Sequence, residues 1–292
     1  KVTLESKTAI EEARKAYDKL TDDQKKLVTN AEKLTKAEEE LQKLEEQQKP
    51  GIGNAVVSVE RFTIGQGYYQ EPVQVKLAEG ETAASLLKKV IGADNYAEDG
   101  FFGGLKGIKG ADLGVDKVSV PSFIPEELQG PTTEDAKGVG NSDEYLDYGD
   151  YSEDSEWYFT LNNTPKDFME MSYKVKDGDT LRFQFSLMMD GEDITGNETV
   201  KISNKDELTK LMAKVNGDKE KYMAMPAVKK TYEEAVAANA AIITSQEEID
   251  TLVKNLQNAM NGNPDEGKED QKKAEAVIEK INAIGEKVTL ES

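Results

Sequence analysis

At 292 residues, the chain is long enough to form several domains. It contains no cysteine and no histidine, which excludes disulfides, thiolate nucleophiles, histidine-based catalytic triads and nearly all zinc sites. Its net charge is −20, and residues 51–200 carry −16 of this with 12 basic and 28 acidic residues, so we expect no nucleic acid partner. No apolar run approaches the ~18 residues that span a bilayer, so we expect no membrane insertion.

Residues 1–49 are predicted to form a helical hairpin. Thr8 and Glu11 have the spacing of a capping box at the start of a first helix, and Thr21 and Gln24 repeat this signature at the start of a second, which should run to about residue 47. The apolar residues of the two helices recur at helical spacing: Ile10, Ala13, Tyr17 and Leu20, then Leu27, Ala31, Leu34 and Leu41. Because two narrow stripes cannot close a core alone, we interpret the hairpin as a partial three-helix repeat.

The end of the sequence offers the missing helix. A helical apolar stripe runs through residues 274–284 and stops at Gly285. The six letters KVTLES then occupy residues 287–292, and they are identical to residues 1–6. We interpret them as the same point in two copies of a repeat, so that residues 264–292 form the first helix of the next copy and the chain is a piece of a longer protein. Two such half-repeats would also allow self-association.

Residues 50–202 are predicted to form a β domain inserted between these helices. Strands are expected over residues 57–64 and 73–77, and a short helix over residues 82–91. A long irregular stretch follows up to Tyr151, with a hint of a strand at residues 118–120, and a loop of this length is usually functional.

The best-patterned β segment lies between Tyr145 and Gly196. It contains the strand-forming run WYFTL at residues 157–161, which ends in the turn residues 162–165. Leu181, Phe183, Phe185 and Leu187 then alternate with Arg182, Gln184 and Ser186. This alternation predicts a strand with one apolar face.

Residues 203–263 are predicted to form an antiparallel three-helix bundle. Signals for helix starts are Asn204 with Glu207, Pro226 at a first helical position, and Ser245 with Glu248. Together, these elements predict an α+β multidomain chain.

Six short motifs lie in order between Val56 and Leu187. They are Gly65-Gln66-Gly67-Tyr68, Glu79-Gly80-Glu81-Thr82-Ala83, Leu146-Asp147-Tyr148-Gly149-Asp150-Tyr151, Ser155-Glu156-Trp157-Tyr158, Val175-Lys176-Asp177-Gly178-Asp179 and Phe183-Gln184-Phe185. With these motifs, the segment resembles the transcobalamin-like C-terminal domain family of secreted and surface proteins from Gram-positive bacteria. The resemblance implies a β-grasp-like fold and a corrinoid (cobalamin) as one candidate ligand. Glu156 stands where the family pattern has a glycine, and Asn162-Asn163 stands where it has Asn-Gly.

The helical parts resemble modules of Gram-positive cell-wall proteins. Thr231-Tyr232-Glu233-Glu234-Ala235, followed by the run SQEEID at residues 245–250, is similar to three-helix modules of wall-associated adhesins. Residues 7–41, with Ala16-Tyr17-Asp18 and Leu20-Thr21, resemble repeats of clostridial surface proteins. These resemblances imply spacers in an extracellular protein attached to the cell wall or cell surface.

Aromatic residues gather around the predicted strands and in glycine-rich loops. The candidate ligand-binding residues are Tyr68, Tyr69, Phe101, Phe102, Tyr148, Trp157 and Tyr158. Such side chains can stack on a glycan, a corrinoid or a partner protein. The alternative is that about half of them belong to the core of a small β domain.

Two acidic segments are candidate calcium sites, because Ca²⁺ takes six to eight oxygen ligands. The first contains Asp147, Asp150, Glu153 and Asp154, flanked by Asp143, Glu144 and Glu156. The second contains Asp190, Glu192, Asp193 and Asn197. The alternative for both is a solvated acidic loop.

Paired carboxylates could perform glycoside hydrolysis, but those in this chain lie in turns without the apolar surroundings that raise a pKa. We therefore expect no enzymatic activity and no required cofactor. The predicted function is ligand binding or adhesion by the β domain, presented on helical spacers. The alternatives are a purely structural surface stalk and a cobalamin-binding domain.

Overall fold

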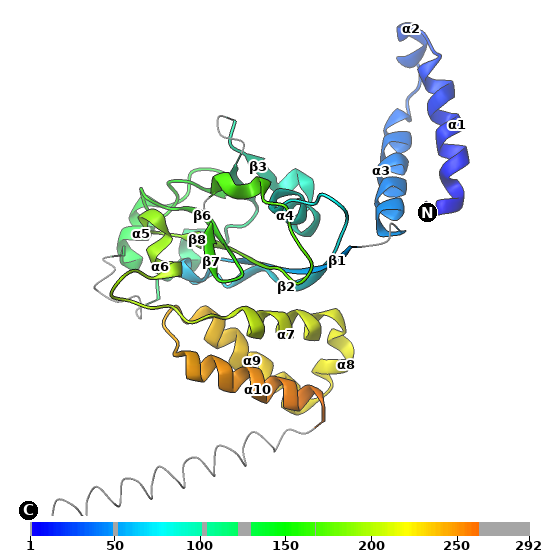
Figure 1. Ribbon diagram of the computed structural model, residues 1–292. Coiled ribbons are helices and arrows are strands. Elements are labelled where there is room, and N and C mark those ends of the chain that lie inside the picture. The colour runs from blue at the N-terminus through cyan, green and yellow to red at the C-terminus, as the bar shows by residue number, and fades with distance from the viewer. Residues whose placement is uncertain (1, 49–51, 101–103, 122–129, 167, 263–292) are drawn as a thin grey trace, which may run out of the picture. The chain divides into compact units, whose positions relative to one another are not determined.

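The computed structural model describes residues 2–48, 52–100, 104–121, 130–166 and 168–262 (Figure 1). The chain divides into two compact units, Lys1–Ile52 and Gly53–Ser292. Helices and a mixed sheet are both present, which confirms the predicted α+β class. The predicted helix at residues 264–292 lies outside the described residues.

Unit 1 contains helices α1 (Lys7–Asp18), α2 (Asp22–Lys25) and α3 (Ala31–Gln48), preceded by a 3-10 turn at Leu4–Ser6. The capping box of Thr21 with Gln24 is confirmed. The capping box of Thr8 with Glu11 is wrong, because α1 already begins at Lys7.

The predicted second helix is also interrupted. It ends at Lys25 and resumes at Ala31, since Thr29 and Asn30 form hydrogen-bonded turns more readily than they continue a helix. Ile10 of α1 and Leu41 of α3 are buried between the two long helices, and Arg14 donates to both carboxylate oxygens of Glu38 at 2.6 and 2.5 Å. This small contact holds the hairpin together.

Unit 2 is built on a five-stranded sheet with the order β2-β1-β8-β6-β7. The strands are β1 (Gly53–Glu60), β2 (Tyr68–Leu77), β6 (Glu156–Leu161), β7 (Thr164–Lys166) and β8 (Thr180–Ser186). β1 and β8 are parallel neighbours at the centre, and the other neighbouring strands are antiparallel. The predicted turn after β6 is confirmed by the positive φ angles of Asn162 and Asn163, which a tight hairpin requires.

A second sheet and several short helices cover one face of this sheet. The smaller sheet is antiparallel with the order β3-β4-β5, formed by β3 (Tyr96–Glu98), β4 (Leu105–Lys109) and β5 (Tyr145–Asp147). The helices on this face are α4 (Ala83–Ile91) and α5 (Thr133–Val139), which contribute Leu86 and Ala136 to the main core. Helix α6 (Glu192–Thr195) follows β8 and lies at its polar face, where Asp193 accepts from Ser186. The 3-10 turns of unit 2 are Phe62–Ile64, Ala93–Asn95, Val115–Lys117, Phe168–Ser172 and Met189–Gly191. The predicted helix at 82–91 is confirmed, and Thr82 forms a capping box with Ser85.

Two predicted strand segments have other structures. Phe62–Ile64 forms a 3-10 turn that ends at Gly65, whose left-handed conformation redirects the chain into β2. Residues 118–120 form no strand, although the Ser119 N–H donates to the Ile64 carbonyl at 3.0 Å. The Val120 N–H donates instead to the Thr133 hydroxyl at 3.0 Å, so no strand ladder forms.

The main apolar core lies between the large sheet, α4 and the smaller sheet. Leu86 and Leu87 of α4 pack there with Val57, Trp157 and Phe183 from the strands. The Trp157 ring meets Phe185 edge to face at 5.4 Å, and Phe159 stacks on Phe183 at 5.3 Å. These cross-strand pairs fix the register of β6 against β8.

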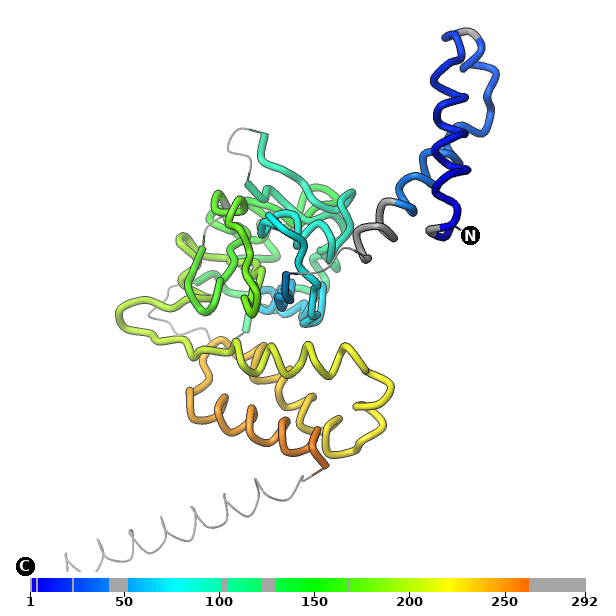
Figure 2. Tube along the Cα trace, turned by 45° about the vertical axis from the view of Figure 1, so that its right-hand side comes forward, coloured from blue at the N-terminus to red at the C-terminus, as the bar shows by residue number. Residues whose placement is uncertain are grey.

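The other face of the sheet is covered by helices from the C-terminal part of unit 2. They are α7 (Asp206–Gly217), α8 (Lys219–Met223), α9 (Pro226–Ala240) and α10 (Gln246–Met260). α7 packs against β2, β1 and β8, and α10 packs against α7 and α9 on the side away from the sheet (Figures 1 and 2). The predicted helix starts at Pro226 and Ser245 are confirmed.

This cover changes the environment of β8. The alternating pattern predicts one apolar face, yet all seven residues of β8 are buried. Its polar residues Arg182, Gln184 and Ser186 therefore lie beneath other elements. Among the residues that the structure describes, no helix is long and apolar enough to cross a membrane.

Candidate functional site

Two of the predicted ligand-binding aromatics lie inside the protein. Trp157 is buried, and its indole N–H donates to the Leu146 carbonyl at 2.7 Å. Tyr158 is also buried, and its hydroxyl donates to Glu156. Burial, followed by this hydrogen bond to Glu156, raises the pKa of Tyr158. Trp157 thus links β6 to β5 of the smaller sheet, and Tyr158 bonds within its own strand. Both residues offer little surface to a ligand.

Tyr68 and Tyr69 at the start of β2 point to different neighbours. The Tyr68 hydroxyl accepts a hydrogen bond from Asn239 Nδ2 of α9 at 2.8 Å, and its ring meets Phe62 edge to face at 4.8 Å. Tyr69 instead donates to the Lys109 carbonyl at 3.3 Å, and Arg61 lies over its ring. Tyr68 thus links the sheet to a helix, and Tyr69 links it to the smaller sheet.

Among the predicted aromatics that the structure describes, Tyr148 is the most exposed. It lies in the connection from β5 to β6, and 66% of its surface is exposed. Phe101 and Phe102 lie outside the described residues. The predicted aromatics therefore occupy the core, the sheet edges and one exposed loop, and the described ones do not form a single surface.

The first predicted calcium segment is organised by its own turn. Asp150 accepts a hydrogen bond from the Asp147 N–H at 2.8 Å, and the Asp147 carboxylate lies 3.2 Å from Lys106. Burial raises the pKa of Asp150 to about 7, even though the hydrogen bond from Asp147 opposes this shift. Glu153 and Asp154 are exposed.

The second predicted calcium segment closes the turn after β8. Asp193 is buried and accepts hydrogen bonds from the Ser186 hydroxyl at 2.6 Å and the Leu187 N–H at 2.9 Å. Burial raises its pKa to about 6. Asn197 Nδ2 donates to Glu192 at 3.3 Å. Within the described part of the chain, no group of three or more acidic side chains is arranged to hold a metal ion.

A set of buried polar side chains fixes the irregular loops of unit 2. The Arg61 guanidinium donates to three backbone carbonyls, those of Gln66, Tyr68 and Ala111. Gln66 in turn donates to Asp112 at 2.8 Å and accepts from the Leu113 N–H at 2.8 Å. These contacts hold the loop after β4 against the turn before β2.

Tyr151 connects this loop to the segment that contains Tyr148. Its hydroxyl donates to Asp112 at 2.7 Å, and its N–H donates to the Gly140 carbonyl at 2.8 Å. Tyr151 has a φ angle of 64°, an uncommon conformation for a bulky residue, and its side chain is buried. One side chain thus ties together the loop after β4, the end of α5 and the turn after β5.

Four large apolar side chains stand exposed on the segments that Tyr151 joins. They are Leu113, Val115, Val139 and Tyr148, with exposed fractions of 58, 41, 51 and 66%. We call this set the loop surface. Of these four residues, only Tyr148 is predicted from the sequence, because isolated aliphatic residues in loops carry no pattern that distinguishes them from core residues.

A second site missed by the sequence analysis is the buried polar cluster on the helix-covered face of the sheet. Arg182 of β8 donates to Glu60 of β1 from Nε at 2.9 Å and from Nη2 at 2.7 Å. Lys205, just before α7, donates to the carbonyls of Asn239 and Ala241 at the end of α9. Burial, and then the neighbouring Arg182, lowers the pKa of Lys205 to about 7, against the opposing effect of Glu60.

The alternation of polar residues in β8 was the available signal for this cluster, but it does not show that helices cover that face. The side chains of this cluster are buried, whereas those of the loop surface are exposed. Comparison with family models, with curated proteins and with solved structures finds no match to this chain.

Proposed function

We propose that the chain is a non-catalytic part of a bacterial cell-surface protein, in which unit 2 binds an extracellular ligand through the loop surface. A finer assignment of the fold as β-grasp-like is part of this proposal. It is supported by the sheet order β2-β1-β8-β6-β7, by the parallel central pair β1 and β8, and by α4 packed on one face. The proposed surface location and the role of the helices as spacers rest on the resemblances of the sequence.

The observation that carries the binding role is the combination of exposed apolar side chains and a fixed backbone. Tyr148 and Leu113 expose more than half of their surfaces, yet the loops that carry them are held by Tyr151 and Arg61. A preorganised loop loses little conformational entropy on binding, and exposed apolar side chains release water when a partner covers them. Binding residues are common on loops held by a rigid scaffold.

Calorimetry with the full chain tests this proposal. Cobalamin, a panel of cell-surface glycans and extracellular host proteins represent the three ligand classes. A Tyr148→Ser variant should weaken binding about tenfold or more, because aromatic residues at the centre of an interface often contribute over 1.4 kcal/mol. Both Tyr148 and the control residue Ile243, which lies after α9, are exposed, so neither substitution should unfold the protein.

Ile243→Ser should leave binding unchanged. Equal losses in both variants would contradict the assignment of the loop surface. Absence of binding to every ligand class would instead support the alternative of a purely structural stalk.

A further inference from the structure

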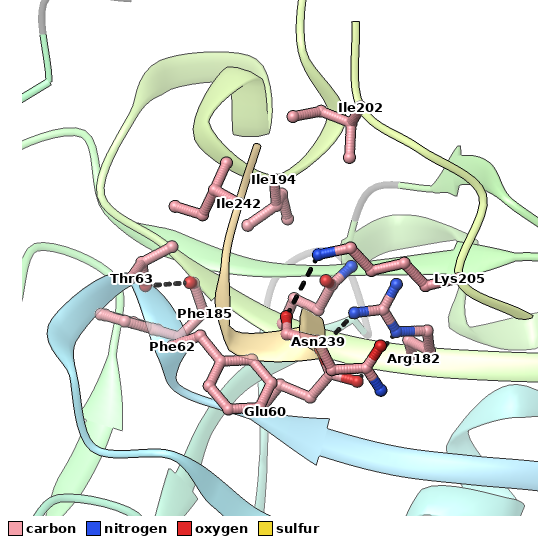
Figure 3. A pocket seen from close by; sticks show the side chains of 11 residues that line it. Glu60, Phe62, Thr63, Arg182, Phe185, Ile194, Ile202, Lys205, Asn239 and Ile242 are labelled. Carbon is pink, nitrogen blue, oxygen red and sulfur yellow. Dashed lines mark hydrogen bonds and ion pairs between the residues drawn. The ribbon is translucent and has the colours of Figure 1, made fainter. Parts of the chain in front are cut away.

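A small cavity lies within unit 2 at the buried polar cluster. Figure 3 shows its lining side chains, which come from β1 and the 3-10 turn after it, from β8, from α6, from the segment before α7 and from the end of α9. The lining residues are Glu60, Phe62, Thr63, Arg182, Gln184, Phe185, Ile194, Ile202, Lys205, Asn239 and Ile242. All of these except Phe62 and Ile202 are buried. Its volume of about 20 Å³ exceeds the ~10–15 Å³ that one water molecule requires.

Two side chains that line the cavity have a polar atom without a hydrogen-bond partner among the described protein atoms. They are Gln184 Nε2, a donor, and Asn239 Oδ1, an acceptor. Only 6% of Gln184 and 3% of Asn239 is exposed, so bulk solvent does not reach them. Buried polar groups normally have partners, because an unpaired one loses its hydration without compensation.

The other polar groups around the cavity are already engaged. Arg182 and Glu60 bind each other, and Thr63 donates to the Phe185 carbonyl at 2.5 Å. Lys205 donates to the carbonyls of Asn239 and Ala241. Among the buried side-chain atoms that line the cavity, those without any partner are therefore one donor, on Gln184, and one acceptor, on Asn239.

This requirement selects the kind of occupant. A monatomic anion could accept from Gln184 but could not donate to Asn239. A metal cation could bind the Asn239 oxygen but would meet the N–H groups of Gln184 with the wrong polarity. A water molecule donates and accepts at once, and buried water typically makes about three hydrogen bonds.

We propose that this cavity is a binding site for one structural water molecule, which accepts from Gln184 Nε2 and donates to Asn239 Oδ1. The water then links the polar face of β8 to α9, beside the direct bond from Asn239 to Tyr68. It forms part of the attachment of the helices to the sheet and is separate from the loop surface.

Diffraction and water relaxation measurements on the full chain test the site. A high-resolution crystal structure should show one ordered water within hydrogen-bond distance of both atoms. Magnetic relaxation dispersion should detect one more long-lived water in the wild type than in a Gln184→Met variant, which keeps the side-chain length but removes the donor. Gln246→Met, at an exposed position of α10, should leave that count unchanged.

Two further results would overturn the proposal. One is an anomalous bromide signal in the cavity after a bromide soak, which would identify an anion site. The other is a higher Tm for Gln184→Met than for the wild type, because removing an unpaired donor from a dry cavity relieves its desolvation. With water present, the same substitution should lower the Tm or leave it unchanged.

Discussion

The buried ion pair between Glu60 and Arg182 offers a quantitative test of how the sheet holds its helices. Glu60→Gln keeps the shape of the side chain but removes its charge. The Arg182 guanidinium then stays buried against a neutral amide, since 7% of its side chain is exposed. Breaking one side of a buried pair typically costs ~3–5 kcal/mol, and we expect a loss of this size.

The contacts of Glu60 support this magnitude. Its carboxylate accepts three hydrogen bonds, from Arg182 Nε at 2.9 Å, Arg182 Nη2 at 2.7 Å and the Ser58 hydroxyl at 2.6 Å. Hydrogen bonds to charged groups contribute about 1.5–3 kcal/mol each, and the amide of glutamine can replace only part of this set. The substitution creates no cavity, so electrostatics and hydrogen bonding dominate the result.

Urea unfolding at pH 7 measures this effect through the fluorescence of Trp157. This residue is the single tryptophan of the chain and is buried on β6 with its ring against Phe185 of β8, so the signal reports on unit 2. With an m-value of about 1–3 kcal/mol per molar urea, the midpoint should fall by roughly 1–3 M or more. Glu207→Gln is the matched control, because the exposed pair of Glu207 with Lys210 should contribute below ~1 kcal/mol.

A double variant, Glu60→Leu with Arg182→Met, should recover much of the lost stability, since apolar side chains of similar volume often replace a buried pair without loss. The reasoning would be refuted if Glu60→Gln and Glu207→Gln shifted the midpoint equally. Such a result would mean that Arg182 reaches water or another acceptor once Glu60 is neutral.

Three further predictions concern single positions. Between about pH 7 and 10.5, the Lys205 side chain is protonated in the unfolded chain but not in the folded chain, where its pKa is about 7, so stability rises with pH in this range. Lys205→Met should remove this rise. Urea titrations of both proteins at pH 7.5 and 9.5 measure the slope, to which histidine and cysteine contribute nothing because the chain has neither. Thr82→Ala should cost ~1 kcal/mol in the same assay by removing the cap of α4, whereas an unchanged midpoint would contradict the cap. Gly191→Ala should lower the midpoint by the equivalent of ~1–3 kcal/mol, because Gly191 has a φ of 66° and the added methyl would lie 3.0 Å from the Tyr158 ring; full stability would show that this loop can shift.

The sequence predicts much of the fold where the signal is local. The capping box of Thr21 with Gln24, the helix start at Pro226 and the turn at Asn162 all depend on residues within four positions of each other. Such signals survive in the folded protein, because each one satisfies backbone groups of its own segment. The cap at Thr8 failed because a 3-10 turn at Leu4–Ser6 starts the helical path earlier.

The candidate site depends on burial, which local patterns do not determine. Trp157 and Tyr148 belong to the same aromatic-rich stretch, but one is in the core and the other faces solvent. Leu113 carries no aromatic signal, and its exposure follows from contacts of Asp112 with Tyr151, 39 positions away. Only the tertiary structure separates these roles.

Burial of the polar face of β8 is also not determined by the local pattern, but a second feature of the sequence indicates it. Alternation in a strand is usually read as one face toward the core and one toward water. In this protein, charges of opposite sign lie on the neighbouring parallel strands β1 and β8. Arg182 pairs in register with Ser58, and Glu60 is two positions further along β1, so it lies on the same face of the sheet as Arg182. Lys205 and Asp206 then bring one charge of each sign from the start of α7 to the same face, and both are buried.

Helix α7 and the residue before it therefore place a further acid and base over the Glu60–Arg182 pair, and all four side chains are buried. Without that cover, Arg182 and Glu60 would sit at the surface, where an ion pair contributes little. With it, the pair is desolvated, and every polar group must find a partner or a water molecule. A polar sheet–helix interface is thus indicated by two sequence features together: a strand that alternates apolar with polar residues, and a following helix whose start has charges of both signs. The Glu60→Gln experiment tests whether this interface stabilises the fold.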